Sequence, residues 1–240
     1  MDFRIHCFGK LPSTNEYAVS NAESLPEGAV ITTLCQTNGR GRLGRKWESG
    51  CGGLYMSVVL KPPAGADIRA LPLIAGLAAS CAVEKVSGLK AMLKWPNDLL
   101  VGSKKIAGIL TESKLPIHIV CGIGINVNGE GFSPELGGKA TSLFIETGRK
   151  FSVADVQGVT LGFFGPLYEN LCSRGFAGIK NGYLSRCVHV SDGGFIKISN
   201  GGERAEEGYF SGITDEGALL LSTGRGIKTI LAGDVSLRMA

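Results

Sequence analysis

Short apolar runs alternate with longer apolar stretches along the first three quarters of the chain, which predicts a mixed α/β domain. Runs rich in β-branched residues predict strands at 28–36 and 52–63, and the Ala- and Leu-rich stretch 69–86 predicts a buried helix. Residues 89–113 predict a strand, a turn, a hydrophobic pair, a second turn and another strand. An almost wholly apolar run at 117–128 predicts one more strand.

Capping residues predict where two further helices begin. Ser13 with Glu16 three positions later forms a capping box. Ser152 is the predicted N-cap of a helix that extends to Cys172, although Pro166 and several glycines weaken the helical pattern.

From about Cys187 the pattern changes to short strands separated by Gly, Asn and Asp turns. Such a series is typical of a small all-β barrel. We therefore predict two domains, a mixed α/β domain at residues 1–186 and a β module at residues 187–240. No internal repeat or low-complexity linker is visible between them.

The composition is that of a globular protein and disfavours several classes. Hydrophobic residues make up 44% and charged residues 19% of the 240 positions, so the chain can bury a substantial core. The N-terminus has no apolar targeting segment, and no stretch reaches the roughly 18 apolar residues of a membrane span. A net charge of only +4 is weak support for a nucleic-acid partner.

The seven cysteines and three histidines form no metal-binding pattern. The cysteines are scattered without the close pairs of a zinc site, and several lie in apolar runs, where Cys packs as a small hydrophobe. We therefore expect a reduced, cytoplasmic protein without a dedicated metal site. His6, His118 and His189 are far apart in sequence, and we expect structural roles for them.

Residues 36–47, QTNGRGRLGRKW, concentrate three arginines, a lysine and three glycines. The segment contains a G-x-G-x-x-G pattern, but a dinucleotide-binding pattern must open a helix, and the Gly-rich RKWESGCGG follows instead. No Walker lysine–serine pair and no kinase-type strand is present. A nucleic-acid interface would need basic and aromatic residues spread over a face, which one loop with one Trp does not supply.

Two interpretations of this basic loop remain, a solvated hairpin and a phosphate-holding loop. Glycines between arginines let the backbone approach an anion while guanidinium groups bind its oxygens in pairs. Trp47 adds a flat face for a base. The second interpretation explains the glycines, and it is therefore favoured.

Four motifs, in order along the chain, resemble the biotin protein ligase family closely: LPSTN, GRGRLGRKW, KWPNDLLVGSKKIAGILTE and CGIGINVN. The tail FSGITDEGALLL…GDVSLR is similar to the SH3-like C-terminal module of that family. The resemblance covers nearly the whole chain. It implies a mixed β-sheet flanked by helices, related to class II aminoacyl-tRNA synthetases, followed by a small β barrel.

The resemblance also implies a two-step reaction. The carboxylate of biotin attacks the α-phosphate of ATP to give biotinyl-5′-AMP and pyrophosphate, with Mg²⁺ inferred from the ATP chemistry alone. A lysine of a biotin carboxyl carrier domain then attacks the activated carbonyl and releases AMP. We hypothesise that the basic loop orders over the adenylate and excludes water from this mixed anhydride.

Matching positions in these motifs imply the catalytic residues. Lys105 resembles the lysine between the biotin carboxylate and the phosphate, whereas Lys104 is expected to be a solvated turn residue. Arg40 and Arg42 match the arginines of the nucleotide-gripping loop. Asp98 resembles the acidic residue that orients or deprotonates the incoming amine. Its alternative role is that of a turn carboxylate bonded to the backbone.

The same matching implies the ligand-binding residues. These are Ser13, Thr14, Asn15, Gln36, Arg40, Gly41, Arg42, Trp47, Asn97, Lys105, Gly108, Gly124 and Asn126. The Ser-Thr-Asn run and the glutamine are implied contacts of biotin, the tryptophan should stack near the adenine, and the last two residues of the set should line the biotin pocket. For Ser13, a helix-capping role is compatible with this function.

The sequence departs from the family pattern at a few positions. Asn38 replaces a common alanine and Leu100 replaces a frequent aromatic residue, and neither position carries charge chemistry. Some family members carry an N-terminal helix-turn-helix domain, but here the Ser-Thr-Asn run begins at residue 13. We therefore expect a mono-functional ligase that acts on a carrier protein, with no DNA or membrane partner, as a monomer or homodimer.

Three other functions were weighed. A lipoate or octanoate ligase has a related scaffold but lacks the Gly-Arg-Gly-Arg loop joined to KWPND. A nucleic-acid-binding module would use the basic loop and the β barrel, but the tail offers no aromatic stacking platform. A pseudo-enzyme that keeps only the scaffold is disfavoured by the intact Lys105, Arg40, Arg42 and Asp98.

Overall fold

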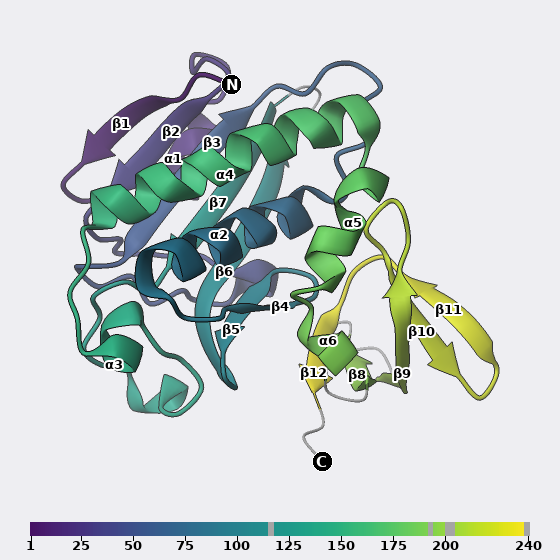
Figure 1. Cartoon of the computed structure of the whole chain (residues 1–240). Coiled ribbons are helices and arrows are strands. Elements are labelled where there is room, and N and C mark those ends of the chain that lie inside the picture. The colour runs from purple at the N-terminus through teal and green to yellow at the C-terminus, as the bar shows by residue number, and fades with distance from the viewer. Residues whose placement is uncertain (115–117, 192–193, 200–204, 238–240) are drawn as a thin grey trace.

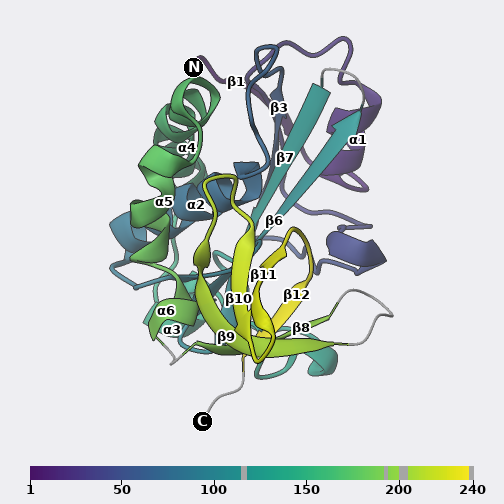
Figure 2. The same cartoon turned by 90° about the vertical axis from the view of Figure 1, so that its right-hand side faces the viewer.

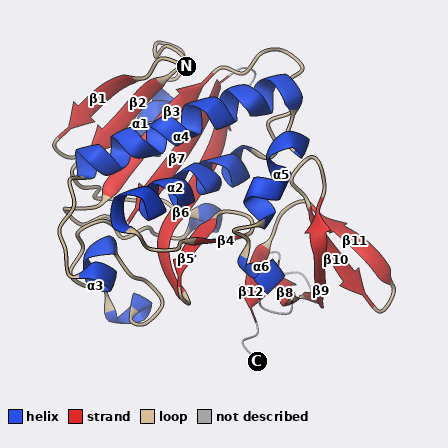
Figure 3. Cartoon of the chain, in the orientation of Figure 1, coloured by secondary structure: helices blue, strands red, loops and turns tan. Residues whose placement is uncertain are grey.

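The structure is a computed structural model that describes residues 1–114, 118–191, 194–199 and 205–237. Within them, the chain forms a seven-stranded sheet with helices on both faces and a separate five-stranded sheet near the C-terminus (Figures 1 and 3). The predicted fold class, a mixed sheet flanked by helices and followed by a small β module, is confirmed. Among the helices described, none is long and apolar enough to cross a membrane.

The larger sheet has the strand order β1-β2-β3-β7-β6-β5-β4. β1 and β2 pair in parallel and the other neighbours pair antiparallel. Its strands are β1 Arg4–Phe8, β2 Ala29–Thr33, β3 Leu54–Leu60, β4 Met92–Lys94, β5 Asp98–Val101, β6 Lys104–Lys114 and β7 His118–Ile125. Every residue of β2 and β3 is buried, as expected where helices cover both faces of a sheet.

The helices divide between the two faces of this sheet. α2 and α4 pack together on one face and α1 lies on the other, as Figures 1 and 2 show. The helical elements are α1 Thr14–Ser20, α2 Leu71–Ser87, α3 Leu143–Thr147, α4 Val153–Arg174, α5 Ala177–Leu184 and α6 Val188–Ser191, with 3₁₀ turns η1 Arg42–Gly44 and η2 Pro134–Leu136.

Both predicted helix starts are confirmed. The Ser13 hydroxyl accepts the N–H of Glu16 at 3.4 Å, and the Ser152 hydroxyl accepts the N–H of Asp155 at 3.2 Å. α4 continues through Pro166 because its apolar side packs against the sheet and α2, which outweighs the lost backbone hydrogen bond.

The smaller sheet has the order β11-β10-β9-β8-β12 and is antiparallel. Its strands are β8 Phe195–Ser199, β9 Glu206–Ile213, β10 Leu219–Thr223, β11 Gly226–Ile230 and β12 Asp234–Leu237. Residues 188–191, within the region predicted to contain short strands, form α6 instead. The turns expected at 192–193 and 200–204 lie outside the described residues, and the domain boundary at 186/187 stays a prediction.

Candidate active site

Two adjoining clefts open where β6, β7, the start of α1 and the basic loop meet. The space in the first cleft measures about 490 Å³ and that in the second about 850 Å³, both counted with the part that is open to solvent. The predicted residues that line the first cleft are Ser13, Thr14, Asn15, Gln36, Arg40, Gly41, Arg42, Trp47, Asn97, Lys105, Gly108 and Gly124. The remaining two, Asp98 and Asn126, line the second cleft, so the structure brings the whole predicted set together.

The start of α1 carries the polar wall of the first cleft. Gln36 Oε1 accepts the N–H of Thr14 at 2.8 Å, and Gln36 Nε2 donates to Ser49 Oγ at 2.7 Å. The hydroxyl of Ser57 lies 2.6 Å from Asn15 Oδ1 and 2.8 Å from Thr14 Oγ1. Because buried polar groups keep their orientation when they are hydrogen-bonded, this wall presents fixed donors and acceptors.

Glycines in β6 and β7 let side chains lie flat against the sheet. A Cβ on Gly122 would lie 2.1 Å from Asn15 Oδ1, so only glycine admits the asparagine there. Gly108 and Gly124 face each other in the register of β6 and β7, and a Cβ on either would lie 3.0–3.1 Å from the Trp47 ring. The indole therefore rests on a floor of backbone.

Trp47 lines both clefts, and its orientation agrees with a stacking role without testing the predicted adenine contact. Lys105 Nζ lies 5.2 Å from the centre of the indole, which is within cation–π range. Within the described residues, the buried indole Nε1 has no hydrogen-bond partner. A ligand acceptor would satisfy this donor.

The arginines of the basic loop are held by partners from other elements. Arg40 Nη2 lies 3.0 Å from Glu112 Oε1, while Glu112 Oε2 accepts Asn15 Nδ2 at 2.9 Å. Arg42 Nη1 donates to Asn97 Oδ1 at 3.1 Å and to the carbonyl of Gly233 at 3.3 Å. Both cations are thus directed toward the clefts by groups that an anionic ligand could displace.

Lys105 and Asp98 form the charged pair at the junction of the clefts. Lys105 Nζ lies 2.6 Å from Asp98 Oδ1, with the lysine side chain 32% exposed. Lys105 belongs to both clefts, whereas the neighbouring Lys104 points to the surface, 4.0 Å from Glu146. The functional interpretation of Asp98 gains support from this pairing, because its carboxylate meets a cation rather than the turn backbone.

Asn126, predicted to line a ligand pocket, lies at the second cleft. Its side-chain Nδ2 donates to the carbonyl of Thr141 at 2.9 Å, and it lines the second cleft instead of the first. The residue therefore anchors the segment after η2 at the wall of the second cleft. Ile123 is buried and lines the first cleft.

Several residues of the site were not predicted from the sequence, among them Ser57, Glu112, Phe132 and Lys139. Ser57 is fully buried and hydrogen-bonds to Thr14 and Asn15 in the wall of the first cleft. Glu112 joins Asn15 to Arg40. Phe132 and Lys139, from the segment between β7 and α3, line the second cleft. Ser57 had a sequence signal, since it is the only polar residue apart from a tyrosine in the strand LYMSVVL. The other three had none.

The first cleft combines a neutral, hydrogen-bonded polar wall with Arg40, Arg42 and Lys105, and the second cleft is mainly lined by charged residues. Lys105 lines both clefts. The chain matches the Biotin/lipoate A/B protein ligase family at residues 8–126 and the biotin protein ligase C-terminal domain at residues 196–238. The bifunctional ligase/repressor BirA of Bacillus subtilis is 36% identical over 233 residues, covering 94% of this chain and 70% of the relative.

Two other comparisons agree with this one. The biotin–[acetyl-CoA-carboxylase] ligase of Paracoccus denitrificans is 34% identical, covering 93% of this chain and 96% of the relative. The biotin protein ligase of Aquifex aeolicus in complex with biotin and ATP has a TM-score of 0.88 and 33% identity, with 99% of each chain covered. The chain belongs to the biotin protein ligase family.

Proposed function

We propose that the protein is an ATP-dependent biotin protein ligase. Biotin lies in the first cleft with its ureido head near Asn15, and its carboxylate attacks the α-phosphate of ATP held in the second cleft. The products are biotinyl-5′-AMP and pyrophosphate. The observation that carries this proposal is the position of Lys105, which lines both clefts where they meet.

Fixed positive charge is what this first step demands. A carboxylate and a phosphate repel each other, and preorganised cations in a partly desolvated site offset that repulsion. Arg40, Arg42 and Lys105 supply these cations from the loop and from β6. ATP would exchange their present protein partners for phosphate oxygens, which accept guanidinium donors in pairs.

Asp98 serves the second step. A lysine of a biotin carboxyl carrier protein enters from the open side of the second cleft and attacks the activated carbonyl, releasing AMP. The carboxylate of Asp98 orients the incoming amine or accepts its proton. Its ion pair with Lys105 at 2.6 Å would hold it beside the reacting carbonyl in the meantime.

The basic loop covers the adenylate in this proposal. Within residues 36–47, the Gly39 carbonyl accepts the N–H of Trp47 at 2.9 Å, and the Gly41 N–H donates to the carbonyl of Arg45 at 2.7 Å. The loop is therefore compact, and its residues line both clefts. Amide exchange of the loop should slow when biotin and ATP are added together. Unchanged exchange would contradict the covering role.

Mg²⁺ would accompany the nucleotide. Asp98 and Glu48 are carboxylates that line the second cleft, and Mg²⁺ usually joins one or two carboxylates to phosphate oxygens and water. In the part of the chain that the structure describes, no group of three or more His, Cys, Asp or Glu residues could hold a metal by itself. We propose in addition a cytoplasmic enzyme, monomeric or homodimeric, that does not bind DNA.

ATP–pyrophosphate exchange tests the function directly. We expect exchange with biotin and none with lipoate or octanoate. Lys105→Ala should reduce the rate about a thousandfold, since it removes the cation that neutralises the developing charge. Lys104→Ala is the matched control and should retain the wild-type rate. Exchange with a dithiolane or fatty acid alone would overturn the choice of biotin, and no exchange with any acid would overturn adenylation.

A further inference from the structure

The turn that joins β4 to β5, Trp95–Asp98, is held by residues that follow α5 in the chain. Three hydrogen bonds tie this region to the C-terminal part of the chain. The N–H of Leu93 donates to the carbonyl of Arg186 at 2.7 Å, the N–H of Trp95 to His189 Nε2 at 3.2 Å, and the indole Nε1 of Trp95 to the carbonyl of Gly217 at 3.0 Å. The Trp95 residue is only 2% exposed, so these bonds are shielded from water.

His189 makes the central bond of this set. The residue is 1% exposed, packs its ring against Phe210, and in the described structure has no hydrogen-bond partner for Nδ1. Burial and the nearby Lys94 cation lower the pKa of His189 to about 4. The ring is therefore neutral near pH 7, and Nε2 is free of a proton and can accept the Trp95 N–H.

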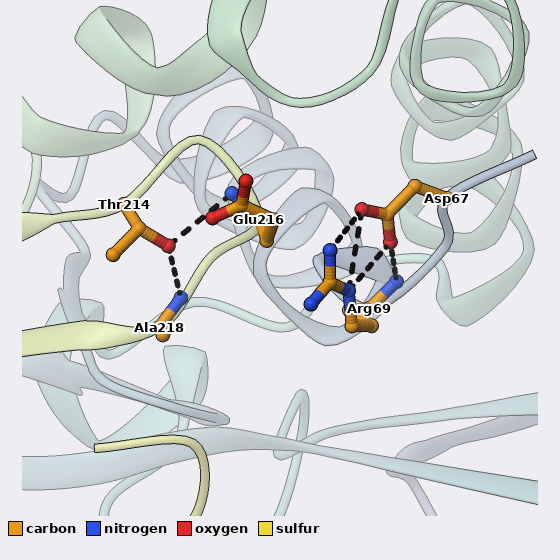
Figure 4. A network of polar contacts seen from close by, with 5 residues as sticks. All are labelled: Asp67, Arg69, Thr214, Glu216 and Ala218. Carbon is orange, nitrogen blue, oxygen red and sulfur yellow. Dashed lines mark hydrogen bonds and ion pairs between the residues drawn. The ribbon is translucent and has the colours of Figure 1, made fainter. Parts of the chain in front are cut away.

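The hairpin between β9 and β10 supplies the other acceptor. The Thr214 hydroxyl accepts the N–H groups of Glu216 and Ala218, and Figure 4 shows this turn near the Asp67–Arg69 pair that precedes α2. Gly217 has a φ of +90°, and a Cβ there would lie 3.0 Å from the Cβ of Ala70. Close contact with α2 thus aims the Gly217 carbonyl at the indole.

The Trp95–Asp98 turn ends at the second cleft. Asn97 and Asp98 follow Trp95, and they contact Arg42 at 3.1 Å and Lys105 at 2.6 Å respectively. Neither His189 nor Gly217 lines the first or the second cleft. The Trp95–Asp98 turn is the direct connection from these two residues to Asn97 and Asp98.

We propose that His189 is a positioning residue, which with the Gly217 carbonyl locks the Trp95–Asp98 turn so that Asn97 and Asp98 keep their places beside Arg42 and Lys105. This inference rests on the proposed ligase function. It assigns the C-terminal module a role in the geometry of the second cleft. The polar wall of the first cleft comes from α1 and β3 and makes no hydrogen bond to His189 or Gly217.

Two substitutions of His189 separate positioning from packing. His189→Leu removes the acceptor, whereas His189→Gln places an amide oxygen near the position of Nε2. In biotin-dependent ATP–pyrophosphate exchange, we expect His189→Leu to lower kcat and raise the KM for ATP, reducing kcat/KM for ATP about tenfold or more. The KM for biotin should stay within about twofold, and His189→Gln should recover most of the loss. Val190→Ala, at a neighbouring exposed position, is the control.

Amide exchange provides a readout other than activity. The Trp95 N–H should exchange faster in His189→Leu than in the wild type and should be protected again in His189→Gln. If His189→Leu does not fold, Trp95→Phe removes only the indole donor to Gly217. This variant should likewise raise the KM for ATP and leave the KM for biotin within about twofold.

The outcomes are distinguishable. A wild-type protein with no biotin-dependent exchange overturns the proposed ligase function. An active wild type with unchanged kcat, ATP KM and Trp95 protection in His189→Leu overturns the positioning role alone. An equal loss for ATP and biotin also overturns it, since that pattern indicates general destabilisation.

Discussion

The two clefts solve different recognition problems with different side chains. The first is walled by neutral polar groups that are almost fully buried and bonded to one another, and Asn15 is only 4% exposed. The second is lined by charged groups that remain exposed, such as Arg45, Lys46 and Lys139. A neutral ligand head needs donors and acceptors at fixed positions, whereas a polyanion needs cations that can adjust to it.

This difference predicts how each cleft responds to change. A fixed network fails when one atom is displaced, because its partners lose their hydrogen bonds together. A set of exposed cations loses affinity gradually, since water screens each charge and partly replaces a missing one. Perturbations confined to one cleft should therefore have little effect on the other.

The largest effect is expected for the pH dependence of stability, and it arises from His189, which supports the second cleft. His189 has a pKa of about 4 when folded and an ordinary value of 6.5 when unfolded, so the unfolded chain binds more protons between these values. Stability then falls as the pH drops from about 6.5 to 4, by roughly 3 kcal/mol from this group. In urea unfolding at pH 7, 6, 5 and 4, the advantage of the wild type over His189→Gln should shrink steadily. A pH-independent difference would contradict the assignment.

The next largest effect is expected from Gly122→Ala, which disturbs the polar wall of the first cleft alone. In Gly122→Ala the new methyl group would occupy the position of Asn15 Oδ1, and the displaced side chain would lose its bonds to Ser57 and Glu112. Biotin affinity should fall about a hundredfold while the affinity for ATP stays within about threefold. Calorimetric titration with each ligand measures both.

A second glycine serves as the control for that substitution. Gly158→Ala adds the same methyl group on the surface of α4, where no atom lies within 4 Å of the new Cβ. It should leave both affinities unchanged. Equal losses of biotin and ATP affinity in Gly122→Ala would show that the clefts are not independent.

The sequence predicted which residues line these clefts better than it predicted the contacts that hold those residues in place. The Ser13 cap, the strands around KWPND and the main helices follow from local patterns of capping and apolar spacing, which are properties of neighbouring residues. β1 was not predicted, because Arg4–Phe8 is a short edge strand whose first four residues are exposed, so it lacks the apolar pattern of a buried strand.

Long-range contacts explain the remaining omissions. Glu112 acquires its role only when β6 brings it between Asn15 and Arg40, which lie 97 and 72 positions away in sequence. The bond from His189 to Trp95 spans 94 positions and requires the C-terminal module to pack against the larger domain. Asn126 lines the second cleft because its side chain turns toward Thr141, a contact that no local pattern specifies.

The smallest effect is expected from the ion pair between Arg40 and Glu112, which connects the basic loop to the polar wall of the first cleft. Arg40→Ala should raise the KM for ATP about tenfold, the usual loss for one charged hydrogen bond. Biotin affinity should stay within about threefold, because Asn15 keeps its bonds to the carbonyl of Leu110 and to Glu112.

Glu112→Gln retains an acceptor for Asn15 and removes only the charge opposite Arg40. A double-mutant cycle of these two changes should give a coupling below about 1 kcal/mol for ATP, as expected of a half-exposed pair, and none for biotin. A large coupling for biotin would show that Arg40 holds the neutral wall through Glu112, and the two clefts would then respond as one.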